Sequence, residues 1–274
     1  MSDGPQADLL ATIVGAARQI TRVREQARPY GSLEAAARRR MPRGDVFREA
    51  LAAGPAPRII AECKRRSPSR GVLRPSYDAA SIAATYEAAG AAAVSVLTEP
   101  SFFDGDLEHL RQARARVSLP VLRKDFVVSA YQVLEAREAG ADATLLIAGA
   151  LTDAELSDLI ACAAGQGLAA LVEVHDEAEL ERALAAGATI VGVNSRDLRT
   201  LVVDLDVARR LAPRLPPGVI GVAESGLTTR AELEVLGDLG YRAFLMGERF
   251  MVEADPGRAL ARFLSAGPGG AGLD

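Results

Sequence analysis

The sequence predicts an α/β protein built as a single (β/α)8 barrel with an N-terminal helical extension. From residue 58 onward, short apolar runs alternate with amphipathic stretches, and the runs number eight. Each run is too short and too apolar for a half-exposed strand, which indicates a parallel strand buried on both faces. Eight such units joined by short connections in about 210 residues favour a closed barrel over a doubly wound sheet.

The apolar runs consist mainly of valine, isoleucine, leucine and alanine. The expected strands are 58–63, 93–97, 121–123, 143–147, 169–174, 190–193, 219–223 and 243–246. The expected helices between and after them are 79–89, 107–117, 130–139, 153–165, 177–186, 207–211, 230–239 and 256–264. Residues able to cap a helix N-terminus precede several of these helices: Asp78, Asp106, Ser129, Thr152, Asp176, Asp204 and Thr228.

The segments that flank the barrel are short. Residues 1–57 predict a helical extension that caps the barrel, with helices at 9–28 and 33–40. The barrel itself is expected over residues 58–266. The last residues, 267–274, are rich in glycine and predict a flexible tail. No second domain is expected.

Composition and charge exclude several classes of partner. The chain is 49% hydrophobic and 25% charged, with a net charge of −4, so it has no basic excess for binding nucleic acid. Its N-terminus lacks the pattern of a signal peptide, and no apolar stretch is long enough to span a membrane. We therefore expect a cytoplasmic protein that acts on a small molecule, as a monomer or as a weak homodimer.

The cysteines and histidines do not form a ligand set. Cys63 and Cys162 are expected to be free thiols, and the two histidines, His109 and His175, lie far apart in the chain. We expect neither a metal site nor a cofactor.

The lysine content is unusual. Among 32 basic residues only Lys64 and Lys124 are lysines, and the other 30 are arginines. Lysine carries a compact ammonium whose pKa can be tuned, whereas arginine keeps its proton at any working pH. The two lysines are therefore candidates for positions that arginine could not fill.

Polar residues gather where the expected strands end, which is the active face of this fold. They are Glu62 and Lys64, Lys124, Glu173, Asn194 and Arg196, Glu224 and Ser225, and Glu248. Glu62 and Lys64 are two residues apart on one strand, so they point the same way, and Cys63 between them points away. Charges confined to one pocket shift one another's pKa and can act as acid–base pairs.

Glycines at the ends of the last two strands predict a phosphate site. Gly226 and Gly247 would let ligand oxygens approach backbone N–H groups, and a short helix is expected to begin near Gly247. The loop 65–71, which contains Ser67, adds hydroxyls and cations that could close over the same anion.

Seven segments, in order along the chain, resemble the indole-3-glycerol phosphate synthase family. They are AECKRRSPSRG (61–71), VSVLTEPSFFDGDLEHL (94–110), LRKDFVV (122–128), LVEVHDEAEL (171–180), VGVNSRDL (191–198), VAESGL (222–227) and LMGERF (245–250). The resemblance implies a carbon–carbon lyase of tryptophan biosynthesis. Its substrate would be 1-(2-carboxyphenylamino)-1-deoxy-ribulose 5-phosphate, and ring closure with loss of CO₂ and water would give indole-3-glycerol phosphate.

The resemblance also implies catalytic roles. Lys124 matches the general acid that protonates the ribulose carbonyl. Lys64 matches a lysine near the anthranilate carboxylate that is also assigned as the acid for dehydration. Glu173 and Glu62 match the two candidate bases, and Glu173 alternatively stabilises the cationic intermediate. Asn194 matches the residue that hydrogen-bonds the sugar hydroxyls.

The remaining matches concern binding. Ser67, Ser225, Gly226 and Gly247, with Glu248 beside them, match positions that bind the phosphate and position the ligand. Arg196 and Glu224 match the polar rim of the pocket. Phe103 and Leu145 match apolar contacts to the anthranilate ring.

Three alternatives remain at this point. A Schiff-base aldolase or a phosphoribosyl isomerase would explain a phosphate site and one lysine, but not both lysines with Glu62 and Glu173. A non-catalytic barrel would not need the whole polar ring. A fragment of a bifunctional enzyme is the third, although the chain ends soon after the eighth strand.

Overall fold

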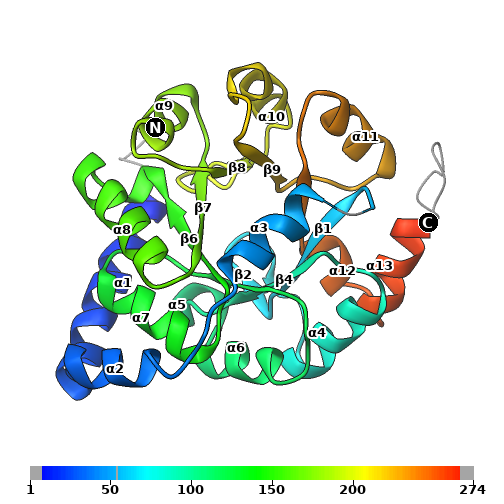
Figure 1. Ribbon diagram of the computed structural model, residues 1–274. Helices are drawn as coiled ribbons and strands as arrows, with labels where there is room; N and C mark the ends of the chain where they lie inside the picture. Colours follow the sequence, from blue (N-terminus) through cyan, green and yellow to red (C-terminus); the bar gives the residue numbers. More distant parts are fainter. Residues whose placement is uncertain (1–7, 54, 266–274) are drawn as a thin grey trace, which may run out of the picture.

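The computed structural model describes residues 8–53 and 55–265, and it contains a closed barrel of eight parallel strands (Figure 1). The barrel order is β1-β10-β9-β8-β7-β6-β5-β4, which confirms the predicted fold. The strands are β1 (Arg58–Cys63), β4 (Ala93–Leu97), β5 (Val121–Lys124), β6 (Ala143–Ile147), β7 (Ala169–Val174), β8 (Ile190–Asn194), β9 (Ile220–Glu224) and β10 (Ala243–Met246). The expected tail, 267–274, lies outside the described residues.

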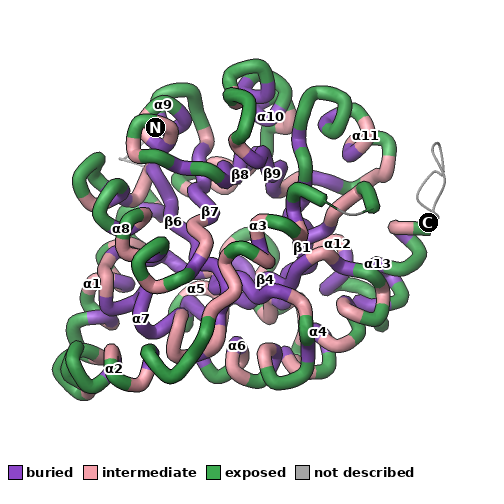
Figure 2. Tube along the Cα trace, viewed as in Figure 1, coloured by how far each residue is buried: buried purple, intermediate pink, exposed green. Residues whose placement is uncertain are grey.

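Helices surround the barrel and pack their apolar sides on it. They are α1 (Leu9–Ala27), α2 (Tyr30–Ala37), α3 (Gly44–Ala52), α4 (Ala79–Ala88), α5 (Pro100–Phe103), α6 (Leu107–Arg114), α7 (Ala130–Ala139), α8 (Asp153–Gly165), α9 (Glu177–Ala185), α10 (Asp206–Leu211), α11 (Arg230–Asp238), α12 (Glu248–Met251) and α13 (Pro256–Ser265). Two 3₁₀ turns, η1 (Ala148–Ala150) and η2 (Ala212–Arg214), and a hairpin of β2 (Arg66–Ser67) and β3 (Gly71–Val72) complete the fold. Figure 2 shows the strands buried and the outer turns of the helices exposed.

Most of the expected helix caps are confirmed. The side chains of Asp78, Ser129 and Thr152 accept hydrogen bonds from backbone N–H groups in the first turn of α4, α7 and α8. The prediction of Thr228 was off by one residue. Thr229 is the N-cap of α11, because it forms a reciprocal capping box with Glu232.

The strand register brings the polar strand ends to one level. Asn194 of β8 pairs with Glu224 of β9, and Glu173 of β7 pairs with Ile147 of β6. Lys124 of β5 pairs with Leu97 of β4. Because all barrel strands run in parallel, these residues meet at the same end of the barrel.

The opposite end of the barrel is closed by α3, a helix that the sequence analysis did not expect. Figure 1 looks onto this end, with α3 lying across its centre. The backbone N–H of Gly44 donates to Gly167 just before β7, and a side chain at Gly44 would lie 2.6 Å from the nitrogen of Ala169. Phe47 and Leu51 are fully buried in the common core. Helix α3 therefore seals the barrel floor.

The first two helices lie on the side of the barrel against α7. Tyr131 and Leu134 of α7 form a small apolar cluster with Leu33 and Ala37 of α2. No helix within 8–53 or 55–265 is both long enough and apolar enough to cross a membrane.

Replacing Phe47 with alanine tests the sealing of the barrel floor. The change empties a fully buried site, and we expect a loss of about 3–5 kcal/mol in the free energy of unfolding. Urea denaturation followed by circular dichroism measures it. The control is Met41→Ala in the same extension, where the side chain is 91% exposed and the expected change is within about 0.5 kcal/mol. Equal effects of the two changes would show that α3 does not pack beneath the barrel.

Candidate active site

A cavity of about 550 Å³ opens at the carboxyl end of the barrel strands. Every candidate site residue from the sequence analysis lines this one cavity. These residues are Glu62, Lys64, Ser67, Phe103, Lys124, Leu145, Glu173, Asn194, Arg196, Glu224, Ser225, Gly226, Gly247 and Glu248. They lie on six of the eight barrel strands and in segments that follow the strands, including those after β4 and β10. The polar residues expected at the strand ends therefore surround one cavity.

The Lys124 ammonium lies at the centre of the charged groups. Its Nζ is 2.8 Å from a carboxylate oxygen of Glu173 and 3.6 Å from one of Glu224. Burial alone would lower the pKa of Lys124, but the attraction of the neighbouring glutamates, Glu173 first, outweighs it and raises the pKa above its ordinary value. The raised pKa keeps Lys124 a charged ammonium at neutral pH.

Glu173 is the ionised partner of Lys124. Burial would raise the pKa of Glu173, but the charge of Lys124 and hydrogen bonds from Lys124 and Asn194 bring that pKa below its ordinary value. Asn194 donates from Nδ2 to Glu173 over 2.9 Å, and its Oδ1 accepts from the backbone N–H of Arg196. The Asn194 carbonyl oxygen lies 2.8 Å from Nδ1 of His175. The two side-chain contacts, to Glu173 and to Arg196, hold the Asn194 amide in one orientation.

Glu224 behaves in the opposite way. Burial raises its pKa well above the ordinary value, and the neighbouring negative charges of Glu173 and Glu62 add to this against the attraction of Lys124. Its Oε1 is buried and makes no hydrogen bond to the described residues. A side chain at Gly192 would lie 2.0 Å from this atom, so the glycine in β8 provides the room for the Glu224 carboxyl. The pKa values of two carboxyls beside one lysine are thus shifted in opposite directions.

The second lysine has its own carboxylate. Lys64 Nζ lies 2.5 Å from Glu62 Oε1, and both side chains are largely buried at the end of β1. Cys63 between them is buried and does not line the cavity, as the alternation predicted. A side chain at Gly247 would lie 2.6 Å from Glu62 Oε1. Gly247 therefore makes room for Glu62, a reason that the sequence analysis did not foresee.

The rim of the cavity contains a chain of charges. Glu248 at the start of α12 forms ion pairs with Arg70 at 2.9 Å and with Arg196 at 3.6 Å. Ser67 is buried in the β2–β3 hairpin, where its hydroxyl accepts from the backbone N–H of Arg70. Ser225 has a left-handed backbone with φ of 64° and is followed by Gly226 with φ of 74°. This backbone turns sharply at the end of β9.

One wall of the cavity is apolar. Phe103 and Leu145 form part of it, together with three residues that the sequence analysis did not single out: Leu97, Phe126 and Ile147. The rings of Phe103 and Phe126 lie 6.2 Å apart. Phe126 follows Lys124 by two residues, and this position just after a strand end could have indicated that Phe126 lines the cavity. Arg70 was considered only as part of the 65–71 loop.

The site shows no arrangement suited to a metal. Within the described part of the chain, no three histidine, cysteine, aspartate or glutamate side chains are grouped so that they could hold an ion. The chemistry available to the described residues is proton transfer and binding of an anion.

Comparisons with known proteins agree on one family. The family model described as indole-3-glycerol phosphate synthase matches residues 10–263. A protein of that name from Variovorax paradoxus is 47% identical over 261 residues, covering 93% of this chain and 98% of the relative. Another from Parafrankia sp. is 52% identical over 235 residues, covering 85% and 88%. A third from Sulfurimonas denitrificans is 49% identical over 224 residues, covering 81% and 85%.

A comparison with solved structures supports the fold alone. A cube-shaped, highly porous protein cage, designed by fusing symmetric oligomeric domains, matches with a TM-score of 0.54 and 16% identity. The match covers 77% of this chain and 72% of the other.

The raised pKa of Glu224 predicts a pH-dependent stability. Above the ordinary glutamate pKa of about 4.3, the unfolded chain loses this proton while the folded protein keeps it. The free energy of unfolding should therefore fall as pH rises, by at most about 1.4 kcal/mol per pH unit. Glu224→Gln removes this contribution. The measurement is urea unfolding between pH 5 and 8. As pH rises, the free energy of unfolding of wild type should fall relative to that of Glu224→Gln.

The control for this titration is Glu234→Gln on the exposed side of α11. Its stability should follow wild type across the same pH range. Parallel curves for wild type and Glu224→Gln would mean that Glu224 is ionised in the folded protein.

Proposed function

Because the chain belongs to the indole-3-glycerol phosphate synthase family, we propose that Lys124 is the general acid of the ring closure that this family catalyses. The enzyme is a carboxy-lyase of tryptophan biosynthesis. It converts 1-(2-carboxyphenylamino)-1-deoxy-ribulose 5-phosphate to indole-3-glycerol phosphate, with loss of CO₂ and water. The observation that carries the proposal is the Lys124 ammonium, held in the cavity by Glu173 and Glu224.

The reaction needs two proton donors and one acceptor. The aromatic carbon attacks the ribulose carbonyl, and the carbonyl oxygen takes a proton as the carbon–carbon bond forms. The carboxylate then leaves as CO₂, which returns its bonding electrons to the ring. The new hydroxyl leaves as water after taking a second proton, and a base removes the last proton to restore the aromatic system.

Lys124 supplies the first proton. It is charged at neutral pH and lies deep in the cavity, so it can meet the carbonyl oxygen of a bound substrate. Glu173 stays ionised beside it and faces the positive charge that develops on the substrate nitrogen. Asn194, fixed by Glu173 and Arg196, donates to the sugar hydroxyls and orients the chain.

Lys64 and Glu62 serve the later steps. The Lys64 ammonium binds the anthranilate carboxylate, or it donates the proton for the loss of water. Glu62 is 2.5 Å away and is the candidate base for the last proton. Because the pair is in direct contact, a proton taken by Glu62 can return to Lys64 for the next cycle.

The substrate is held at both ends. We propose that its phosphate binds at the N-terminus of α12, where the first backbone N–H groups have no partner within the helix. The residues of this site are Ser67, Ser225, Gly226, Gly247 and the backbone N–H of Glu248. The Glu248 carboxylate contacts Arg70 and Arg196, so its side chain orients these cations. The anthranilate ring packs on the apolar wall of Phe103 and Leu145. Anchoring both ends brings the two reacting carbons together at low entropic cost.

A Schiff-base aldolase is disfavoured by the charge state of Lys124. A lysine attacks a carbonyl only as the neutral amine, and the carboxylates around Lys124 raise its pKa and keep it charged.

We propose further that residues 1–57 form an extension of the barrel and that the protein acts in the cytoplasm. The cavity is complete within one chain, which supports a monomer, and a weak homodimer is the alternative. Two free cysteines suit a reducing compartment.

Substitution of Lys124 by methionine tests the proposal. The change keeps an unbranched side chain but removes the proton donor, so we expect kcat to fall by about 10²–10⁴-fold with a smaller change in KM. Formation of indole-3-glycerol phosphate from the synthetic substrate is followed by indole fluorescence. A Lys124→Met enzyme with kcat near that of wild type would refute the assignment.

The same assay with Lys64→Met separates the two roles of Lys64. A carboxylate anchor shows mainly as a higher KM, whereas a second acid shows mainly as a lower kcat. The control is Arg262→Met, an exposed position on α13, which should match wild type in both constants.

A further inference from the structure

Arg123 lies directly before Lys124 and points to the opposite side of β5. Lys124 faces the cavity, so Arg123 faces the layer between the barrel and α7, where it meets the Asp125 carboxylate. The Arg123 side chain is completely buried, and it is the largest of the fully buried side chains. An arginine in such a place must be paired, because a buried charge without partners costs several kcal/mol.

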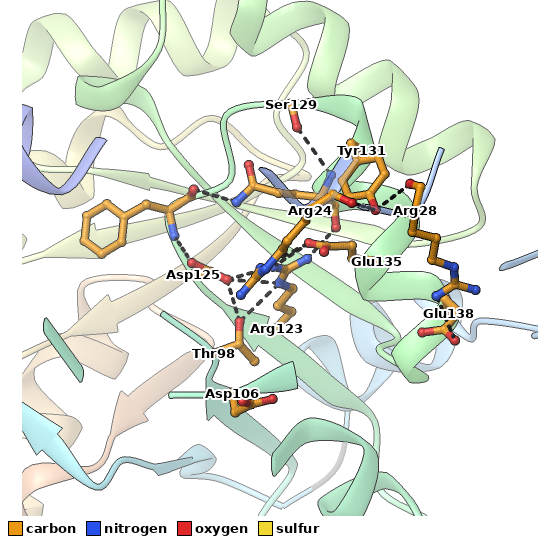
Figure 3. A network of polar contacts seen from close by, with 12 residues as sticks. Arg24, Arg28, Thr98, Asp106, Arg123, Asp125, Ser129, Tyr131, Glu135 and Glu138 are labelled. Atoms are coloured by element: carbon orange, nitrogen blue, oxygen red, sulfur yellow. Dashed lines mark hydrogen bonds and ion pairs between the residues drawn. The ribbon is translucent and has the colours of Figure 1, made fainter. Parts of the chain in front are cut away.

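The guanidinium of Arg123 binds three elements at once (Figure 3). Nη2 donates to Asp125 over 2.8 Å and to Glu135 of α7 over 3.2 Å. Nη1 donates to the backbone oxygen of Gln132 over 2.6 Å. Nε donates to the hydroxyl of Thr98, which itself donates to Asp125 over 2.6 Å. Arg123 therefore ties the ends of β4 and β5 to α7.

The residues that bind Arg123 also hold the backbone from the Lys124 carbonyl onward. The Lys124 carbonyl accepts from the backbone N–H of Thr98, and Asp125 Oδ1 accepts from the N–H of Phe126. The Gln132 amide then donates to the carbonyl of Phe126 and accepts from the N–H of Val128. The segment that carries Lys124 is thus held from β4 and from α7.

The cluster continues into the N-terminal helix. Arg24 of α1 lies 3.5 Å from the same oxygen of Glu135 that binds Arg123. The Tyr131 hydroxyl of α7 is 3.1 and 3.0 Å from the carbonyl oxygens of Arg24 and Arg28. Arg123 and Arg24 balance the two carboxylates, Asp125 and Glu135, so these four side chains carry no net charge.

We propose that Arg123 is a positioning residue for Lys124, and that the charge cluster through which it acts extends to Arg24 of the N-terminal helix. The proposal rests on the catalytic role of Lys124 proposed above. Without Arg123, Asp125 and Glu135 remain as two buried carboxylates without their shared cation. The junction of Thr98 and Asp125 then loosens next to Lys124. A shift of about 1 Å at a reacting group can cost about 100-fold in rate.

The test compares Arg123→Met with Arg114→Met. Arg114 is also mostly buried and pairs with Asp142, but it lies at the other end of the barrel strands. Each change removes the more buried of two arginines beside a buried carboxylate, because Arg24 remains beside Glu135 and Arg43 remains beside Asp142. Both should therefore lower Tm, by about ten degrees. We expect only Arg123→Met to lower kcat per folded molecule, by about tenfold or more, with KM within about threefold. Rates are measured well below both Tm values, with the folded fraction determined by circular dichroism.

Two further variants separate positioning from stability. The double variant Arg123→Met, Glu135→Gln also removes one of the two carboxylates that had bound Arg123. Tm should therefore recover in part while kcat stays low. Arg123→Lys keeps the charge but cannot bind Asp125 and Glu135 through a fork, so kcat should lie between Arg123→Met and wild type. Arg24→Met should lower kcat less than Arg123→Met, because Arg24 is partly exposed and its contact is long. If Arg24→Met has wild-type kcat, Arg24 does not contribute to positioning Lys124, and the cluster that does so extends only to Glu135.

The outcomes distinguish this inference from the proposed function. If Lys124→Met is inactive while the Arg123 variants turn over like wild type when folded, the positioning role is wrong and the function stands. If Lys124→Met is active, the proposed function fails first. Recovery of kcat together with Tm in the Arg123→Met, Glu135→Gln double variant would make Arg123 a stability residue only. If Arg123→Met does not fold, Glu135→Gln, which retains Arg123, gives the same comparison of kcat with Tm.

Discussion

The attraction between the Lys124 ammonium and the carboxylates around it organises this molecule. Removing a lysine charge from water is costly, and a buried lysine without partners would lose its proton. Here Glu173 at 2.8 Å, with Glu224 and Glu62 in the same cavity, reverses that tendency. The cavity therefore holds the Lys124 charge among buried carboxylates. The neighbouring side chains hold this ammonium in place, as Glu173 and Asn194 do.

The barrel supplies what this arrangement needs. Lys124, Glu173 and Glu224 come from β5, β7 and β9, alternate strands whose inward side chains share one level. Two glycines make room for carboxyls on the adjacent strands: Gly192 of β8 for Glu224 of β9, and Gly247 after β10 for Glu62 of β1. Behind β5, the cluster of Arg123 provides a second set of buried charges on the outer side. One strand thus carries a reacting ammonium on its inner face and its support on its outer face.

Much of this was predictable from the sequence. The eight apolar runs gave the strands to within about a residue because parallel barrel strands are buried on both faces. The scarcity of lysine pointed to Lys64 and Lys124, and the strand ends pointed to the rest of the polar ring. Helix α3 was missed because its apolar residues, such as Phe47, face a barrel floor that exists only after folding. The opposite pKa shifts of Glu173 and Glu224 depend on distances of a few ångströms, and no spacing in the sequence encodes those. From the sequence, Arg123 was only the last residue of an expected strand. No local pattern indicates that Glu135, twelve residues later, forms an ion pair with it.

The charge of Lys124 can be measured directly because the chain contains only two lysines. Labelling lysine with ¹⁵N at Nζ gives two side-chain resonances, and Lys64→Arg removes one of them and so assigns the other. At pH of about 10.5 an ordinary lysine is about half deprotonated. With the fold verified by circular dichroism at that pH, the Lys124 resonance should still be that of an ammonium. A Lys124 resonance that moves to the position of an amine at or below that pH would contradict the central claim.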